Sequence, residues 1–89
     1  MSKKEAIKKK ATLENEADKA IFQKLRAYRL SIAKELNIAP FIIFHDSTLI
    51  EIAKVKPENL EQFASISGVG QTKLERYGSG FLEVIVNHP

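Results

Sequence analysis

The sequence predicts an all-α fold, a compact bundle of about five short helices. In several stretches apolar residues recur at the i, i+3, i+4 spacing of a helix, and these stretches end near a proline or a glycine. The one run that resembles a strand, residues 41–44, has no second strand in the sequence with which to pair. The chain of 89 residues is long enough for one domain with a simple core.

Residues 1–16 are polar and rich in lysine, and their few apolar residues form no stripe. We interpret them as a flexible arm or linker, and residues 17–89 as the folded domain. The net charge of +3 divides into +2 on the arm and +1 on the rest, so the domain itself is nearly neutral. Any binding of nucleic acid must therefore come from a local basic patch, with a diffuse contribution from the arm.

The first helix is expected from about residue 17 to Leu36, with Asp18 as its N-cap and Pro40 soon after its end. Leu30 lies off the apolar stripe and is expected to be exposed. One buried face is predicted for Ile21, Phe22, Leu25, Tyr28, Ile32, Ala33 and Leu36.

The run at residues 41–44 is expected to form a short helical turn or an extended loop. Four large apolar side chains cannot all point inward from so short a piece. We therefore place Ile43 and Phe44 in the core and Phe41 at its rim.

Two further short helices are expected after this run. Asp46 or Ser47 caps the first, which continues to about Val55. The second begins at Asn59, which forms a pattern typical of a capping box with Gln62 three residues later.

A turn at Gly68, Val69 and Gly70 separates these helices from the last one. Gly68 suits a positive φ, and the amides after Gly70 lack helical partners, which makes a position suited to a phosphate. The pattern resembles the helix-hairpin-helix, a clamp for nucleic acids, although a turn that binds nothing has the same sequence. In the last helix, residues 78–80 (Gly-Ser-Gly) leave open a kink or a break.

The sequence lacks the residues that several classes of chemistry need. There is no cysteine, no Gly-x-x-x-x-Gly-Lys-Ser/Thr loop and no metal-ligand spacing of histidines, so we expect no cofactor and no enzyme activity from this chain alone. No apolar run approaches the about 20 residues of a membrane span, and the start of the chain does not resemble a secretory signal.

The ordered set of motifs resembles the HRDC domain, which is named for RecQ helicases and RNase D. The resemblance covers roughly residues 20–87, and its closing part is most similar to bacterial RecQ DNA helicases. The residues that carry it are Ile21–Arg26, Arg29, Ile32–Ala33, Pro40–Phe44, Thr48–Leu49, Ile52–Ala53, Ile66–Gly70, Lys73–Gly78 and Phe81–Leu82.

The resemblance implies an accessory domain that binds single-stranded or junction DNA weakly, without sequence preference, and so tunes the substrate choice of a helicase. It also implies the helicase core as a partner, a cytoplasmic, nucleoid-associated bacterial location, a monomer, and no membrane partner. The candidate DNA-binding residues are Phe41, His45, Lys54, Lys56, Lys73 and Arg76, with Gly68, Val69 and Gly70 as a phosphate-binding turn.

Other interpretations remain open. Phe41 fits a core position, Lys73 and Arg76 fit a solvated face, and Arg26 and Arg29 fit ion pairs on a helix surface. As a whole, the domain also fits a protein-docking module that uses Leu30, Phe41 and Ile42, or the RNA-binding domain of an RNase D-like exonuclease.

Overall fold

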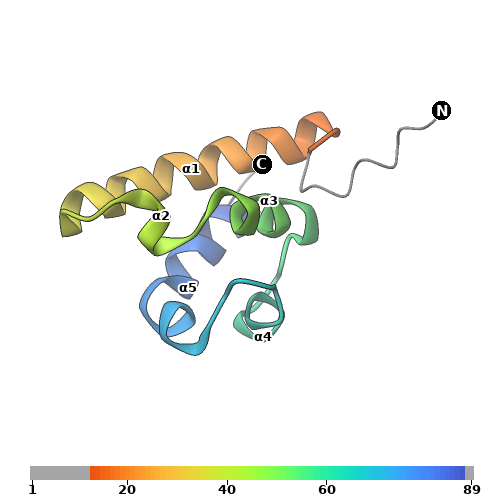
Figure 1. The fold of residues 1–89 in the computed structure, drawn as a ribbon. Helices are drawn as coiled ribbons and strands as arrows, with labels where there is room; N and C mark the ends of the chain where they lie inside the picture. Colours follow the sequence, from red (N-terminus) through yellow and green to blue (C-terminus); the bar gives the residue numbers. More distant parts are fainter. Residues whose placement is uncertain (1–12, 88–89) are drawn as a thin grey trace.

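A computed structural model describes residues 13–87, which form five α-helices and contain no strand (Figure 1). The all-α prediction is therefore confirmed. The arm predicted for residues 1–16 lies largely outside the described residues, so its boundary stays a prediction. The helices are α1 (Glu16–Leu36), α2 (Pro40–Ile43), α3 (Asp46–Val55), α4 (Leu60–Ala64) and α5 (Gln71–Val86).

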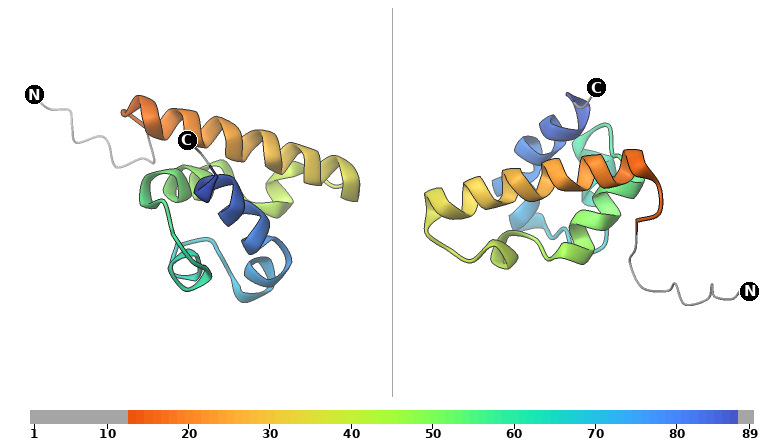
Figure 2. Two further views of the ribbon diagram at one scale, coloured as in Figure 1. Left: turned by 180° about the vertical axis from the view of Figure 1, so that it is seen from behind. Right: turned by 90° about the horizontal axis from the view of Figure 1, so that it is seen from above.

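The long helix α1 lies across the other elements and contacts α2, α3 and α5, while α4 packs against α5 (Figures 1 and 2). Aromatic rings fill the centre of the core. Phe81 meets Tyr28 edge-on at 4.8 Å between ring centroids and meets Phe44 at 5.1 Å. These contacts join α1, the α2–α3 connection and α5 at one point.

The predicted apolar face of α1 is correct for most of its length but not at its ends. Asn15, not Asp18, is the N-cap, because its side chain accepts hydrogen bonds from the amides of residues 17 and 18. Asp18 instead pairs with Lys56 across the fold. Leu36, predicted to be buried, is 51 % exposed, because it is the last residue of the helix. Leu30 is exposed, as predicted.

The caps of α3 and α4 differ from each other. The N-cap of α3 is His45, which makes no side-chain capping bond, so the expectation of Asp46 or Ser47 was wrong. Asn59 caps α4 as predicted and accepts from the amide of Gln62. Gln62 reaches back to the amide of residue 58 and not to that of Asn59, so the reciprocal bond is one residue longer than in the capping box.

The two glycine-containing segments have different structures. Gly68 has φ +95°, as the predicted turn requires, and Val69 between the glycines packs against the core. By contrast, α5 continues without a break through Gly78 and Gly80, so residues 78–80 form no turn.

Candidate nucleic-acid interface

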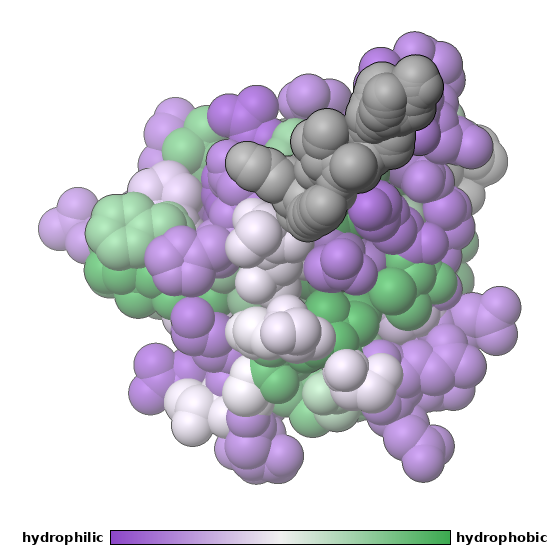
Figure 3. Space-filling view, turned by 45° about the vertical axis from the view of Figure 1, so that its right-hand side comes forward, coloured by the Kyte–Doolittle hydropathy of each residue, from purple (hydrophilic) through white to green (hydrophobic). Residues whose placement is uncertain are grey.

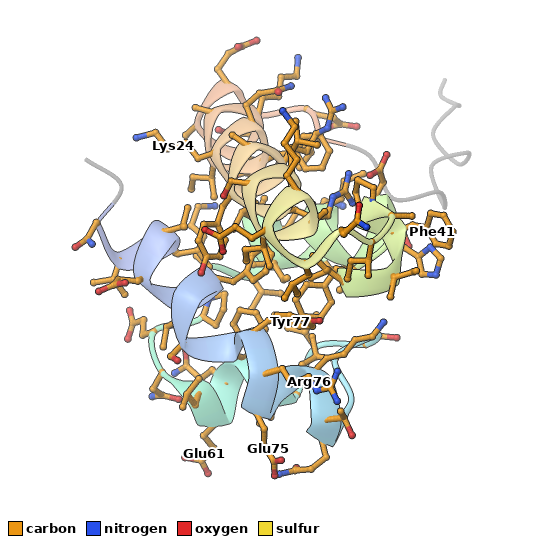
Figure 4. The ribbon with its side chains drawn as sticks, turned by 90° about the vertical axis from the view of Figure 1, so that its left-hand side faces the viewer. Lys24, Phe41, Glu61, Glu75, Arg76 and Tyr77 are labelled. Atoms are coloured by element: carbon orange, nitrogen blue, oxygen red, sulfur yellow. The ribbon has the colours of Figure 1, made fainter. Side chains whose placement is uncertain are left out.

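The short helix α2 and the residue that follows it direct two side chains into the core and two toward solvent. Pro40 stands at its first position, where a proline loses no hydrogen bond. Ile43 and Phe44 are fully buried, whereas Phe41 is 59 % exposed and Ile42 is also exposed. The predicted division between core and rim is confirmed, and it leaves Phe41 projecting outward from α2 (Figure 4).

Arg29 of α1 holds the α2–α3 connection in place. Its guanidinium donates to the carbonyl of Phe44 at 2.8 Å and pairs with Asp46 at 2.8 Å, and the residue is only 7 % exposed. Arg29 therefore does not form an ion pair on the surface of one helix. It is buried and joins α1 to the α2–α3 connection. Its spacing of four residues from both Leu25 and Ala33, which are buried, is the signal that places it on the inner face.

The ring of Phe41 stacks on the imidazole of His45. The ring centroids are 6.0 Å apart and the planes differ by 20°. Both residues are exposed, and His45 follows directly after the carbonyl that Arg29 holds. The two side chains form a flat, exposed pair on a firmly anchored connection.

Lys73, in the first turn of α5, lies near the same connection. Its Nζ is 5.8 Å from the centroid of the Phe44 ring. The preceding turn packs against α3, because Gly68 is in close contact with Thr48, one turn after His45. Lys73 lies against Phe44 and the Gly68–Gly70 turn lies against Thr48, so both border the stretch of chain that carries Phe41 and His45. We call Phe41, His45, the Gly68–Gly70 turn and Lys73 the α2–α5 cluster.

The N-terminus of α5 borders the cluster. The first intrahelical donor is the amide of Leu74, which bonds to the carbonyl of Gly70 at 2.9 Å. Gly70 supplies no side-chain cap, so the amides of residues 71–73 have no helical acceptor. These free amides are the feature on which the expectation of a phosphate-binding turn rests, and any uncapped helix has them, so that expectation stays a prediction.

Arg76 is exposed one turn further along α5, while its neighbour Tyr77 points toward the middle of the molecule (Figure 4). Arg76 lines an open hollow together with Tyr28 and Glu83. Burial, and then the charges of Glu83 and Glu35, raise the pKa of Tyr28 above its ordinary value. The carboxylate of Glu83, which lines the hollow, makes it less favourable for a phosphate.

Lys54 and Lys56 lie at the other end of α3 from His45. Lys56 forms an ion pair with Asp18 of α1, whereas Lys54 is exposed. The structure therefore does not bring these two lysines together with Phe41.

The surface is mainly hydrophilic on the face shown in Figure 3, with a band of hydrophobic side chains across its middle. Glu61 and Glu75 lie at the end of the molecule away from Phe41 (Figure 4). Among residues 13–87 there is no group of three or more side chains that suits a metal ion. None of the described helices is both long and apolar enough to cross a membrane.

Comparison with known proteins agrees with this architecture. Residues 18–85 match the HRDC domain family. The chain is 44 % identical to the ATP-dependent DNA helicase RecQ of Haemophilus influenzae over 71 residues, which is 80 % of this chain and 12 % of that protein. It is 40 % identical to the RecQ helicase of Bacillus subtilis over 85 residues, which is 96 % of this chain and 14 % of that protein.

Two further similarities extend the comparison. The ATP-dependent DNA helicase UvrD2 of Mycobacterium bovis is 39 % identical over 70 residues, which is 79 % of this chain and 10 % of that protein. The solved structure of D. radiodurans RecQ HRDC domain 3 has a TM-score of 0.74 and 29 % identity, and covers 76 % of this chain and 90 % of that one.

The helicases that the chain matches are much longer than it is, since it spans only 12–14 % of the RecQ relatives. HRDC is an accessory domain in such ATP-dependent helicases, and this chain corresponds to that domain alone. The family match over residues 18–85 agrees with the order of the five helices. The chain therefore belongs to the HRDC domain family.

Proposed function

We propose that this HRDC domain is an accessory DNA-binding domain of a RecQ-type helicase acting on bacterial DNA in the cytoplasm. It binds single-stranded or junction DNA weakly and without sequence preference, and so tunes the substrate choice of the helicase core. In this proposal Phe41 and His45 stack on a base, while Lys73, Arg76, Lys54 and Lys56 contact phosphates. Residues 17–89 form the binding domain, and residues 1–16 serve as a flexible arm or linker.

The exposed Phe41 ring is the observation that carries this proposal. A phenylalanine that is 59 % exposed contributes little to the core, yet its connection is held rigidly by Arg29. A flat aromatic surface on a rigid support suits stacking with a base of any sequence, worth about 1–3 kcal/mol per base.

The charge distribution supports weak binding. The domain is nearly neutral, so long-range attraction to a polyanion is small. Lys73, at the uncapped N-terminus of α5, lies against Phe44, the residue next to His45 in the chain. Arg76 shares its hollow with Glu83 and Lys56 must leave Asp18 to reach a phosphate, so both contribute less than Lys73.

Fluorescence anisotropy with a labelled oligothymidylate at several salt concentrations tests the proposal. We expect an affinity in the micromolar range or weaker and a slope of log K against log salt of roughly −2 to −4, from about 0.7 per phosphate contact. Phe41→Ala weakens binding by about 1–3 kcal/mol and leaves the slope nearly unchanged. Lys73→Ala makes the slope shallower by about 0.7.

Two controls make the test specific. Phe41→Leu keeps an apolar side chain but removes the flat ring, so it should lose nearly as much affinity as Phe41→Ala. A labelled RNA of the same length tests the RNA-binding alternative. Absence of binding at low salt and high micromolar protein contradicts the proposal, and so does a Phe41→Ala variant that binds as well as the parent.

A second candidate function is protein docking. It is favoured by the exposure of Leu30, Phe41 and Ile42, which are 47 %, 59 % and 48 % exposed on the α1–α2 side of the molecule. In that case the isolated domain binds no oligonucleotide, and a purified helicase core of the same parent protein binds it. Loss of that binding on Ile42→Asp, with DNA binding absent throughout, identifies this function.

A further inference from the structure

An open hollow of about 310 Å³ lies between α1 and α2, beside the α2–α5 cluster but outside it. Its volume is at the lower end of the range for small-ligand sites, large enough for one nucleotide unit. The residues that line it are Gln23, Arg26, Ala27, Arg29, Leu30 and Pro40.

Arg26 supplies the hollow with a positive charge that takes part in no ion pair within the described residues. The three ion pairs within residues 13–87 use Lys19, Arg29 and Lys56, and none uses Arg26. The Arg26 guanidinium lies 6.0 Å from the centroid of the Phe22 ring, which supports it from one face. A guanidinium held in this way keeps the donors on its edge available, and their fork matches a phosphate.

Arg29 also lines the hollow, but its charge is compensated within the fold. Its terminal nitrogens are occupied by the Phe44 carbonyl and by Asp46. Its Nε is buried and has no acceptor within the described part of the chain. Because this N–H is buried, Arg29 keeps a structural role, and Arg26 is the lining residue that can offer its charge to a phosphate.

Leu30 of α1 and Pro40 of α2 give the lining an apolar part. Pro40 precedes Phe41 in the chain, so their Cα atoms are about 3.8 Å apart. A strand that stacks one base on Phe41 can therefore bring an adjoining nucleotide to the hollow. The hollow offers that nucleotide a cation for its phosphate and an apolar surface for its sugar.

We propose that the Arg26 hollow is a nucleotide subsite, in which Arg26 binds the phosphate next to the base stacked on Phe41. This inference rests on the proposed DNA-binding function and adds to it the path of the bound strand. The strand runs from the α2–α5 cluster over Pro40 onto α1.

Oligothymidylate binding by three variants tests the subsite. Arg26→Ala weakens binding about tenfold at low salt, as expected for the loss of a charged hydrogen bond. It also makes the salt slope shallower by about 0.7. Arg26→Lys keeps the salt slope and recovers part of the affinity, because it retains the charge without the fork. Lys24→Ala is the matched control, since Lys24 is also a cation of α1 but points to the side away from Phe41 (Figure 4).

A spectroscopic measurement on the unmodified chain avoids any dependence on variants that fold poorly. On addition of the oligonucleotide, the ¹H–¹⁵N resonance of the Arg26 Nε is expected to shift together with the ring resonances of Phe41. If the Arg26 resonance stays in place while those of Phe41 move, the subsite is absent.

The outcomes separate the subsite from the broader function. If Arg26→Ala binds within about twofold of the parent while Phe41→Ala binds weakly, the subsite is wrong and the DNA-binding function stands. If Lys24→Ala loses as much affinity as Arg26→Ala, the effect is one of general charge and the subsite is again wrong. If the parent chain binds no oligonucleotide at low salt, both proposals fall.

Discussion

Two segments of this domain each contain two glycines separated by one residue, Gly68 and Gly70 in the turn and Gly78 and Gly80 in α5. The two pairs have different structural roles. In the turn, Gly68 provides a backbone conformation, because its φ of +95° is one that side-chain-bearing residues rarely adopt. In α5, Gly78 and Gly80 have ordinary helical conformations and provide space. A Cβ at Gly80 would lie 2.8 Å from Cζ of Tyr28 and would overlap its hydroxyl. Glycine in a helix therefore marks here a close approach of α5 to α1 and not a break.

The largest effect is expected for Gly68→Ala. The substitution forces alanine into a positive φ and drives its Cβ into Oγ1 of the buried Thr48. We expect a loss of about 2–3 kcal/mol of unfolding free energy in chemical denaturation, the sum of backbone strain and overpacking. The double variant Gly68→Ala/Thr48→Ala should recover only the part of the unfolding free energy that is lost to overpacking. A Gly68→Ala variant as stable as the parent would mean that the turn has a different backbone.

Gly80→Ala is expected to change the unfolding free energy less than Gly68→Ala does. The sign of the change distinguishes helix propensity from packing against Tyr28. If the glycine only weakened the helix, alanine would stabilise the domain by about 1 kcal/mol through helix propensity. Since the added methyl group meets Tyr28, we expect a net destabilisation of about 1 kcal/mol in the same denaturation experiment.

Tyr28→Phe is the control for this substitution, because it removes the hydroxyl that the new methyl group would overlap. In the Tyr28→Phe background the loss caused by Gly80→Ala should be smaller. Stabilisation by Gly80→Ala in the parent background would contradict the packing role.

Gly70→Ala is expected to have the smallest effect. Gly70 has a negative φ of −85°, and no atom lies within 4 Å of a Cβ built there. We expect the unfolding free energy to change by no more than about 0.5 kcal/mol, mostly from the poorer N-cap. This variant is also the matched partner of Gly68→Ala, since both lie in one turn. Equal losses from the two substitutions would show that the turn tolerates no side chain at either position.

The sequence was informative where one element alone decides the outcome. The face of α1 from Ile21 to Ala33, the inward Ile43 and Phe44, the outward Phe41 and Leu30, and the turn at Gly68 all follow from local periodicity or backbone preference. Which side chains are buried follows from the 3.6-residue spacing of the helix, and the place of the turn follows from the residues that tolerate a positive φ. Both features can be recognised in a short stretch of sequence.

Predictions failed where a partner distant in sequence takes part. Asp18 and Asp46 are both good capping residues, yet one pairs with Lys56 and the other with Arg29. The sequence cannot reveal this competition, because the partner of each aspartate lies at least 17 residues away and comes close only after folding. The same holds for Arg29, whose interpretation as a surface residue neglected the carbonyl of Phe44.

By itself, the sequence determined that this protein is a small helical domain with a glycine turn, an exposed aromatic residue and the motif order of the HRDC family. Only the tertiary structure decided which of the candidate residues are neighbours. It placed Lys73 against Phe44 in the α2–α3 connection, put Lys54 and Lys56 at the far end of α3 from His45, and opened a hollow at Arg26. The physical reason is that a helical pattern defines which face of each helix is apolar, whereas a surface site depends on how those faces dock against one another.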